Sequence, residues 1–159
     1  MLRFGSGSSE GVDTRTAVEG AVAAAAAQAG LDSAAARLVT LHVTVGHDEG
    51  AILEAVRRLC PDARIAGCSV AGVVSRDGAD EGMYAVALML VWGSPGEVGM
   101  AVTRHLDGAN STSEGAGLAR RLVDEHGQPR FLMFIGSGID IDVRGCIDGI
   151  ESVVGTDVV

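Results

Sequence analysis

A chain of 159 residues with 47% hydrophobic and 21% charged residues predicts one globular domain and excludes a disordered polypeptide. Its formal net charge of -9 and its lack of lysine argue against nucleic acid and anionic membranes as partners, because both repel an acidic surface. The 23 glycines and only 3% aromatic residues indicate that backbone elements pack closely through small side chains.

Cysteine usage and the apolar runs bear on the cellular compartment. The chain has three cysteines, namely Cys60, Cys68 and Cys146. An odd number without a C-x-x-C pair argues against a disulfide framework or a structural zinc site and predicts a reducing environment. Residues 1–9 contain no apolar signal-peptide core, and the apolar runs at 21–27 and 84–92 are shorter than the ~20 residues of a spanning helix. We therefore expect a cytoplasmic protein.

The N-terminal residues predict an extended piece, a loop and a helix. Residues 1–12 start with a short extended piece and continue into a Gly/Ser stretch, which predicts a loop. Asp13 or Thr14 can cap a helix that continues to about Ala29 and ends at Gly30. The inner face of this helix is mostly alanine, so the helix should lie close against a sheet.

A strand–helix–strand unit follows. Residues 37–45 alternate apolar and polar side chains, which predicts a strand. Asp48 can cap the next helix, which ends before Pro61. Residues 64–66 predict a short strand that leads into a tight turn at 67–72, where small residues allow close backbone approach.

Three sequential strands are predicted next, at residues 70–75, 82–92 and 97–106, with turns at 77–82 and 94–96. The middle strand is apolar on both faces, so we expect it to be central in the sheet and covered on each side.

The last third of the chain predicts two helices around one strand. Ser111 and Glu114 have the spacing of a capping box at the start of a helix that ends near His126. Residues 131–135 predict a buried strand, and residues 143–154 predict the second helix.

These elements predict an α/β fold with a mixed sheet, in which antiparallel central strands are flanked by βαβ-like units and packed helices. Residues 38–67 and 131–159 share one outline, which is an apolar strand, a glycine turn with an aspartate and an amphipathic helix. The first copy ends in the turn at 67–72, and the second stops before the counterpart of that turn. We therefore expect residues 1–159 to form a single domain that is truncated at its C-terminal end.

Cys68 is the candidate nucleophile in the tight turn. A reactive thiol needs a base or a positive local field, and His42 and His47 are the candidate helpers, although no spacing pairs either with Cys68. A phosphatase-type loop needs an arginine six positions after the cysteine, whereas Arg76 follows Cys68 by eight. A thiol-dependent enzyme that uses Cys68 therefore stands as an alternative to a small buried thiol.

Other chemistry-bearing motifs are weak. No phosphate-binding loop with a lysine exists in a chain without lysine. Gly136-Ser137-Gly138 is followed by Ile139 and Asp140 and lacks the third glycine of a dinucleotide-binding loop. Asp140 and Asp142 offer two carboxylates without further ligands, so we expect one of them to cap the next helix. No cofactor and no metal are expected.

Three loops follow predicted strands, at residues 46–48, 67–72 and 136–140, and we expect them to meet at one edge of the sheet. They offer backbone N–H groups, hydroxyls and two carboxylates, which suit a small polar metabolite. The predicted ligand-binding residues are His47, Asp48, Gly67, Cys68, Ser69, Gly72, Gly136, Ser137 and Asp140.

The stretch Ile65-Ala66-Gly67-Cys68-Ser69-Val70-Ala71-Gly72 resembles the N-terminal FIST domain, as do Phe4-Gly5-Ser6-Gly7, the alanine-rich helix and residues 131–155. The resemblance covers nearly the whole chain, and Gly-Cys-Ser-x-Ala-Gly is its most specific part. It implies an intracellular sensory domain for small ligands, with amino acids or their derivatives suggested. The partner it implies is a signalling output domain or protein, such as a kinase or a chemotaxis-type receptor.

Two alternatives stay open beside a sensory domain. A thiol-dependent enzyme predicts that Cys68 is alkylated faster than Cys60 or Cys146. A structural or interaction fragment of a larger protein predicts exposed apolar surface, and hence a homodimer or aggregation.

Overall fold

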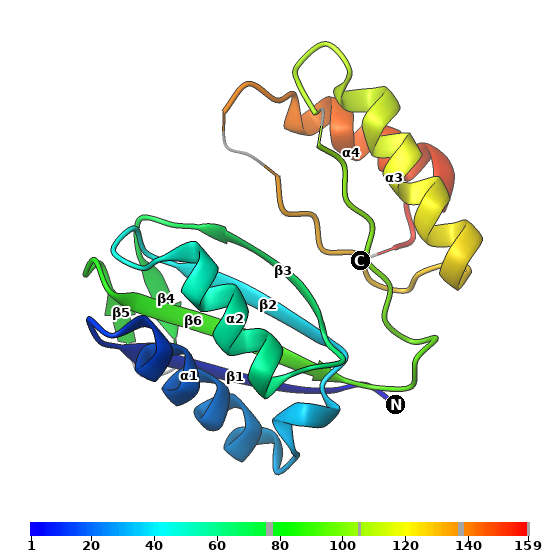
Figure 1. The fold of residues 1–159 in the computed structure, drawn as a ribbon. Coiled ribbons are helices and arrows are strands. Elements are labelled where there is room, and N and C mark those ends of the chain that lie inside the picture. Colours follow the sequence, from blue (N-terminus) through cyan, green and yellow to red (C-terminus); the bar gives the residue numbers. More distant parts are fainter. Residues whose placement is uncertain (76–77, 105, 137–138, 159) are drawn as a thin grey trace. The chain divides into compact units, whose positions relative to one another are not determined.

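A mixed four-stranded sheet organises the first half of the chain (Figure 1). Its strands stand in the order β1 (Arg3–Glu10), β6 (Ala85–Trp92), β2 (Leu38–Val43) and β3 (Arg64–Ser69). β6 is antiparallel to both β1 and β2, whereas β2 and β3 are parallel. This arrangement confirms the predicted α/β class with a mixed sheet, and it places β6 in the centre, as its apolar sequence predicts.

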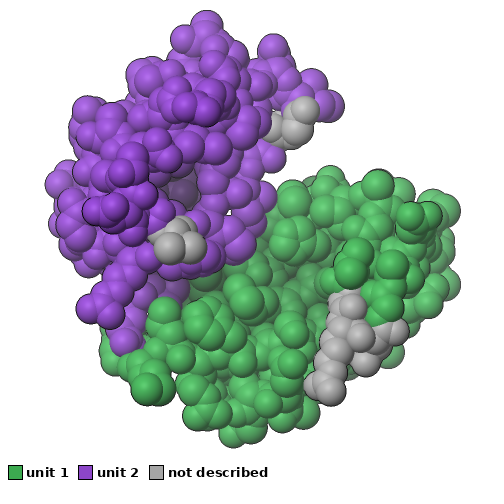
Figure 2. Space-filling model, turned by 180° about the vertical axis from the view of Figure 1, so that it is seen from behind, with its two compact units in different colours: residues 1–95 green, residues 96–159 purple. Residues whose placement is uncertain are grey.

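The structure, a computed structural model, describes residues 1–75, 78–104, 106–136 and 139–158. They divide into unit 1 (residues 1–95) and unit 2 (residues 96–159), which Figure 2 shows in different colours. Each unit has its own internal packing.

Helices α1 (Thr14–Ala29) and α2 (Glu49–Leu59) cover one face of the unit 1 sheet (Figure 1), and a 3-10 turn, η1 (Ser33–Ala35), leads into β2. The inner side chains of the helices and strands form one hydrophobic core, which includes Val18, Val22, Val39, Ile52, Val56, Leu88 and Leu90. The other face of β6 carries Ala87 and Met89, which are half-buried, and Ala85 and Val91, which are buried. Within unit 1, helices cover one face of this strand, whereas its sequence pattern predicted cover on both faces.

The Gly/Ser stretch near the N-terminus is strand β1, and the prediction of a loop there was wrong. At Gly5 and Gly7 an added Cβ would collide with the carbonyl oxygens of Ala25 and Ala21 in α1. The glycines are therefore what lets α1 lie directly on β1, and pairing with β6 supplies the hydrogen bonds that hold the strand. Local propensity is overruled here by tertiary contact.

The helix ends of unit 1 follow the local signals. Asp13 Oδ1 accepts a hydrogen bond from Thr16 N at 2.8 Å, and Gly30 ends α1 with a φ of 65°. Asp48 Oδ1 accepts one from Ala51 N at 2.7 Å at the start of α2. Both predicted N-caps are confirmed, because a short acceptor side chain satisfies backbone donors that a helix leaves free.

Strand β3 is longer than predicted and takes in the first half of the expected turn. Gly67, Cys68 and Ser69 pair with Leu41, His42 and Val43 of β2 and continue the parallel ladder. An added Cβ at Gly67 would collide with the carbonyl oxygen of Leu41, so the glycine serves a close approach of two strands. The turn itself begins only at Val70.

A small hairpin follows β3. Strands β4 (Val73–Ser75) and β5 (Gly78–Asp80) pair antiparallel. The strand predicted at 70–75 is thus shortened, and part of the turn predicted at 77–82 is a strand. Both differences from the prediction result from the pairing of β4 with β5. Three residues on each side are enough to form this hairpin because the partner strand is adjacent.

Unit 2 is built on two closely packed helices, α3 (Ser111–His126) and α4 (Val143–Val154). An added Cβ at Gly115 would collide with the backbone of Cys146, and one at Gly149 with that of Thr112. These glycines bring the two helix backbones together. None of the helices in the described ranges is long and apolar enough to span a membrane.

The two strands predicted in this half of the chain are absent from the described residues of unit 2. Residues 97–104 and 131–136 form neither helix nor strand, and Phe131 and Met133 are 62% and 44% exposed. A strand forms when a neighbouring strand takes its backbone hydrogen bonds, and no strand ladder includes either segment in the described part of unit 2. The two strands predicted from the apolar patterns of these segments were therefore wrong.

The prediction of a capping box at the start of α3 was also wrong. Ser111 is the first helical residue, and its Oγ donates to Asp107 O at 2.6 Å and accepts from Asp142 N at 3.0 Å. The Glu114 carboxylate accepts from Thr103 Oγ1 at 2.6 Å. Both side chains hold neighbouring segments to the helix start instead of bonding each other's backbone.

Candidate functional site

The loops that follow β2 and β3 lie at the same end of the unit 1 sheet. The two strands are parallel neighbours, and Val70 N still donates to Val43 O at 2.9 Å where they end. Gly46 N donates to Met83 O at 2.8 Å, which ties the first loop to the start of β6. The carboxyl ends of parallel strands are where α/β sheets commonly bind ligands. Residues 46–48 and 70–72 therefore form the candidate site.

His47 is the most deeply buried of the predicted site residues with a titratable side chain, with 8% of it exposed. Its Nδ1 lies 3.1 Å from Thr14 Oγ1, at the start of α1. The edge of the ring meets Tyr84, with centroids 5.9 Å apart and planes at 79°. Its Nε2 is buried without a hydrogen-bond partner. A buried polar atom left unpaired costs about 1–3 kcal/mol, so this nitrogen is a place where a ligand atom would be favourable.

Two helices begin beside His47. Thr14 is the first residue of α1 and Asp48 is the N-cap of α2. Helix N-termini carry partial positive charge on their free N–H groups. Hydrogen bonding to Thr16 lowers the pKa of the exposed Asp13 carboxyl group, so it stays ionised at the first of these termini. Asp13 and Asp48 each accept a hydrogen bond from one N–H group of a first helical turn. The other N–H groups of these two turns are not capped by these carboxylates.

Cys68 lies within β3, half-buried, directly opposite His42 of β2 in the parallel register. No sequence motif pairs these residues, because they are 26 positions apart and only the strand register brings them together. The other two thiols are buried. Burial raises the pKa of the Cys60 thiol to about 11, with a smaller effect from the Asp32 carboxylate. Burial also raises the pKa of Cys146, and Asp142 adds to that shift.

The glycines of the predicted site have packing roles in the structure. Gly67 serves the approach of β3 to β2, as described above. At Gly72 an added Cβ would lie 3.0 Å from Asp80 O and 3.2 Å from Glu81 Cγ, so the chain passes close to the β4–β5 hairpin. Ser69 is exposed at the end of β3. Contact of these residues with a ligand stays a prediction.

The third predicted loop belongs to unit 2. Gly136 packs under the Phe134 ring and Ile141, and Asp140 has a φ of 60°. Ser137 lies outside the described residues. The carboxylate that caps α4 is that of Asp142, whose Oδ1 accepts from Gly145 N at 2.9 Å, as expected for one of the two aspartates. Convergence of this loop with the two loops of unit 1 stays a prediction.

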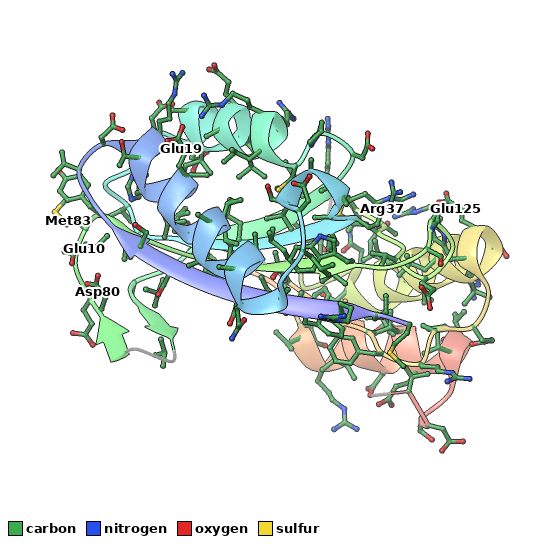
Figure 3. All side chains as sticks on the ribbon, turned by 90° about the horizontal axis from the view of Figure 1, so that it is seen from below. Glu10, Glu19, Arg37, Asp80, Met83 and Glu125 are labelled. Atoms are coloured by element: carbon green, nitrogen blue, oxygen red, sulfur yellow. The ribbon has the colours of Figure 1, made fainter. Side chains whose placement is uncertain are left out.

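A pocket of about 290 Å³ lies beside the end of β1 and was missed by sequence reasoning. Its lining residues are Ser8, Ser9, Glu10, Val73, Gly78, Ala79 and Asp80. Figure 3 shows Glu10 and Asp80 at the same end of the unit. The pocket forms between residues of β1 and of the β4–β5 hairpin. It was missed because the sequence predicted a loop for most of β1 and a turn for β5. The alternation of glycine and serine in residues 5–8 was the sequence feature that could have indicated strand β1.

Potential metal-binding side chains do not cluster in the described parts of the chain. Within these ranges no three His, Cys, Asp or Glu side chains gather closely enough to hold an ion. The Asp80 carboxylate in the pocket already accepts from Gly82 N at 2.6 Å.

Comparison with known proteins identifies a family. The model of a family described as FIST N domain, a family of sensory domains in signal transduction, matches residues 37–159, which is most of the chain and includes parts of both units. None of the curated proteins matches the chain.

Proposed function

Because the chain belongs to the FIST N domain family, we propose that it is a sensory module that binds a small polar metabolite at the carboxyl ends of β2 and β3. The proposed ligand class is an amino acid or a close derivative. The proposed setting is the cytoplasm, with a signalling domain or protein as the recipient of the signal. The family gives the sensory role, and the site geometry supports the place and the class of ligand.

The observation that carries this proposal is the orphaned Nε2 of His47. If the Thr14 hydroxyl donates to Nδ1, Nε2 carries a hydrogen and would donate to a ligand carboxylate. If Nδ1 donates to Thr14, Nε2 is a lone-pair acceptor for a ligand ammonium group. An amino acid has both groups, so it suits either tautomer. Nε2 is shielded from solvent, so the proposal includes a movement of residues 46–48 as the ligand enters.

A thermal-shift screen of the full chain against amino acids and their derivatives tests this function. A ligand at a hundredfold excess over its dissociation constant stabilises the native state by about 2.7 kcal/mol. We expect His47→Asn to abolish the shift, since the amide cannot place a hydrogen-bonding atom at the position of Nε2. His126→Asn, in unit 2, is the matched control and should leave it unchanged.

The His47 resonances provide the second readout. We expect the ligand to shift the Nε2 signal of His47 in a ¹⁵N spectrum of imidazole side chains, while the His42 signals move less. Stabilisation that survives His47→Asn, or the absence of any stabilising ligand across the screen, would refute the proposal.

Thiol chemistry at Cys68 is the second candidate, and the His42 side chain opposite it is the observation that favours it. Faster alkylation of Cys68 is expected in any case, because Cys60 and Cys146 are buried. The discriminating measurement is therefore the pH dependence of the alkylation rate in wild type and in His42→Gln. An enzyme-like pair predicts that the substitution moves the pH midpoint, whereas a bystander histidine leaves it in place.

A further inference from the structure

His47 connects the starts of α1 and α2. These helices follow β1 and β2, which run parallel to each other because both are antiparallel to β6, so the helices begin at the same end of the sheet (Figure 1). Arg15 in the first turn of α1 lies 3.6 Å from Glu54 in the second turn of α2. His47 precedes the Asp48 N-cap of α2, and its Nδ1 lies 3.1 Å from the hydroxyl of Thr14, the first residue of α1.

This end of unit 1 presents backbone hydrogen-bond donors. The carboxylate and the carbonyl oxygen of Asp13 each accept one N–H group of α1, and those of Asp48 do the same in α2. These caps do not bond the first two N–H groups of each helix, at residues 14–15 and 49–50. Because the N-terminus of a helix carries partial positive charge, both helix starts favour acceptor atoms.

The Thr14 hydroxyl determines which nitrogen of His47 carries hydrogen. A hydroxyl can donate and accept, whereas each nitrogen of a neutral imidazole does only one of these. Within the described ranges, His47 Nδ1 is the acceptor that the structure gives this hydroxyl. Nδ1 also faces the positive end of the α1 dipole, where a lone pair is favoured over an N–H group. Both effects leave Nδ1 without hydrogen and place the hydrogen on Nε2.

The Nε2–H group is then a buried donor that has no acceptor. His47 is 8% exposed, and Nε2 has no hydrogen-bond partner. A ligand oxygen satisfies this donor, whereas an ammonium group, which has only donors, leaves it unsatisfied. The carboxylates of Asp13 and Asp48, which attract cations, are exposed and already bonded to helix N–H groups, so solvent screens that attraction.

For the sensory role proposed above, on which this inference rests, we propose that Thr14 is a positioning residue that keeps the hydrogen of His47 on Nε2, so that the site recognises the carboxylate of its ligand. One carboxylate oxygen accepts from Nε2–H as residues 46–48 move to admit the ligand. The uncapped N–H groups at residues 49–50 offer donors to the second oxygen. The ligand class is therefore carboxylic acids, with or without an amino group, and it excludes amines that have no carboxylate.

A long-range ¹H–¹⁵N spectrum of the free chain tests the tautomer. At about pH 8 free imidazoles are neutral, and the chemical shifts of the two ring nitrogens then show which of them carries hydrogen. We expect the His47 signals, assigned by their loss in His47→Asn, to show the hydrogen on Nε2. A spectrum with the hydrogen on Nδ1 would overturn the proposal before any ligand is added.

Thermal shifts of the full chain with matched probes test the ligand class. The probes are the standard amino acids, each with its deaminated acid and its decarboxylated amine, which for leucine are 4-methylpentanoate and 3-methylbutylamine. We expect the acid to stabilise the chain as its parent amino acid does. The amine should bind roughly a hundredfold or more weakly, because it leaves the buried donor unpaired.

Thr14→Val removes the hydroxyl and keeps the shape of the side chain. We expect both tautomers of His47 to be populated, and the affinity for these acids to fall by roughly two- to tenfold, because only part of the molecules can then bind. Thr14→Ser keeps a hydroxyl and should retain the wild-type spectrum and affinity. Circular dichroism checks that α1 persists in both variants. An unchanged tautomer in Thr14→Val would mean that Thr14 does not position the ring.

Failure of this proposal is distinguishable from failure of the sensory function. A thermal shift with amines and not with acids, or hydrogen on Nδ1 in a chain that binds amino acids, overturns carboxylate recognition and leaves the sensory function in place. No thermal shift with any amino acid, acid or amine refutes the sensory function, and the proposal with it.

Discussion

Cys60 shows how one buried residue makes stability depend on pH. Only 1% of Cys60 is exposed, and burial raises the pKa of its thiol from 9.0 to about 11. Between these values the unfolded chain releases the thiol proton while the folded chain keeps it. The stability that the neutral thiol contributes is therefore complete below pH 9 and is lost as the pH rises toward 11. The expected loss is on the order of 2 kcal/mol.

Denaturant titrations at pH 8 and pH 10.5 measure this effect. We expect the stability difference between the two pH values to be smaller in Cys60→Ala than in wild type. Cys68→Ala, at a half-buried thiol, is the matched control and should retain the full difference. An equal pH dependence in Cys60→Ala and wild type would mean that the Cys60 thiol titrates alike in both states.

At the scale of elements, Asp48 carries a structural role that must be separated from its predicted contact with a ligand. Its carboxylate caps α2, and loss of such a cap costs about 1 kcal/mol. We expect Asp48→Ala to lose that amount in denaturant unfolding followed by Trp92, the single tryptophan of the chain. Asp48→Asn should keep most of the stability, because asparagine caps helices as well as aspartate does.

Glu54→Ala is the matched control for this prediction. Glu54 lies on α2 with 76% of its side chain exposed, 3.6 Å from Arg15, and exposed ion pairs contribute about 0–1 kcal/mol. If Asp48→Ala and Glu54→Ala lower the free energy of unfolding equally, the Asp48 cap does not stabilise α2 more than an exposed ion pair does. If Asp48→Asn abolishes ligand binding at unchanged stability, the carboxylate charge acts on the ligand directly.

The helices of this chain could be predicted because their signals are local. Asp13, Asp48 and Asp142 each bond an N–H group three residues away, and Gly30 ends α1 through its own backbone conformation. Strands depend on partners that are distant in sequence. The Gly/Ser stretch of β1 is a strand because β6 pairs with it, and the apolar residues 131–135 are not a strand because no described neighbour does.

The candidate site was predictable only in part for the same reason. Its position after β2 followed from the strand and the Asp48 cap, both of which are local features. The contact of His47 with Thr14 joins residues 33 apart, and the alignment of Cys68 with His42 depends on the register of β3. The pocket beside Glu10 required two strands that read as loop or turn. Long-range pairing, which the sequence pattern does not encode locally, decides each of these.

On the scale of the whole molecule, the main hydrophobic core lies in unit 1, and a smaller set of buried side chains in unit 2 includes Leu118, Ala119 and Cys146. Each residue of the main core cluster lies between residues 17 and 92, and both sheets are formed by residues 3–92. A domain that closes its own core can fold alone. We therefore expect a fragment of residues 1–95 to unfold cooperatively, with a denaturant midpoint close to that of the full chain.

Trp92 makes this measurement specific to unit 1. Its side chain is 5% exposed, and its Nε1 donates to Asp32 O at 2.8 Å, so its fluorescence reports the packing of the sheet against η1. The fragment and the full chain should give the same Trp92 unfolding curve, while circular dichroism of the full chain adds the contribution of α3 and α4. A fragment that lacks a cooperative transition would show that unit 1 needs residues 96–159 to fold, and that the two units act as one cooperative domain.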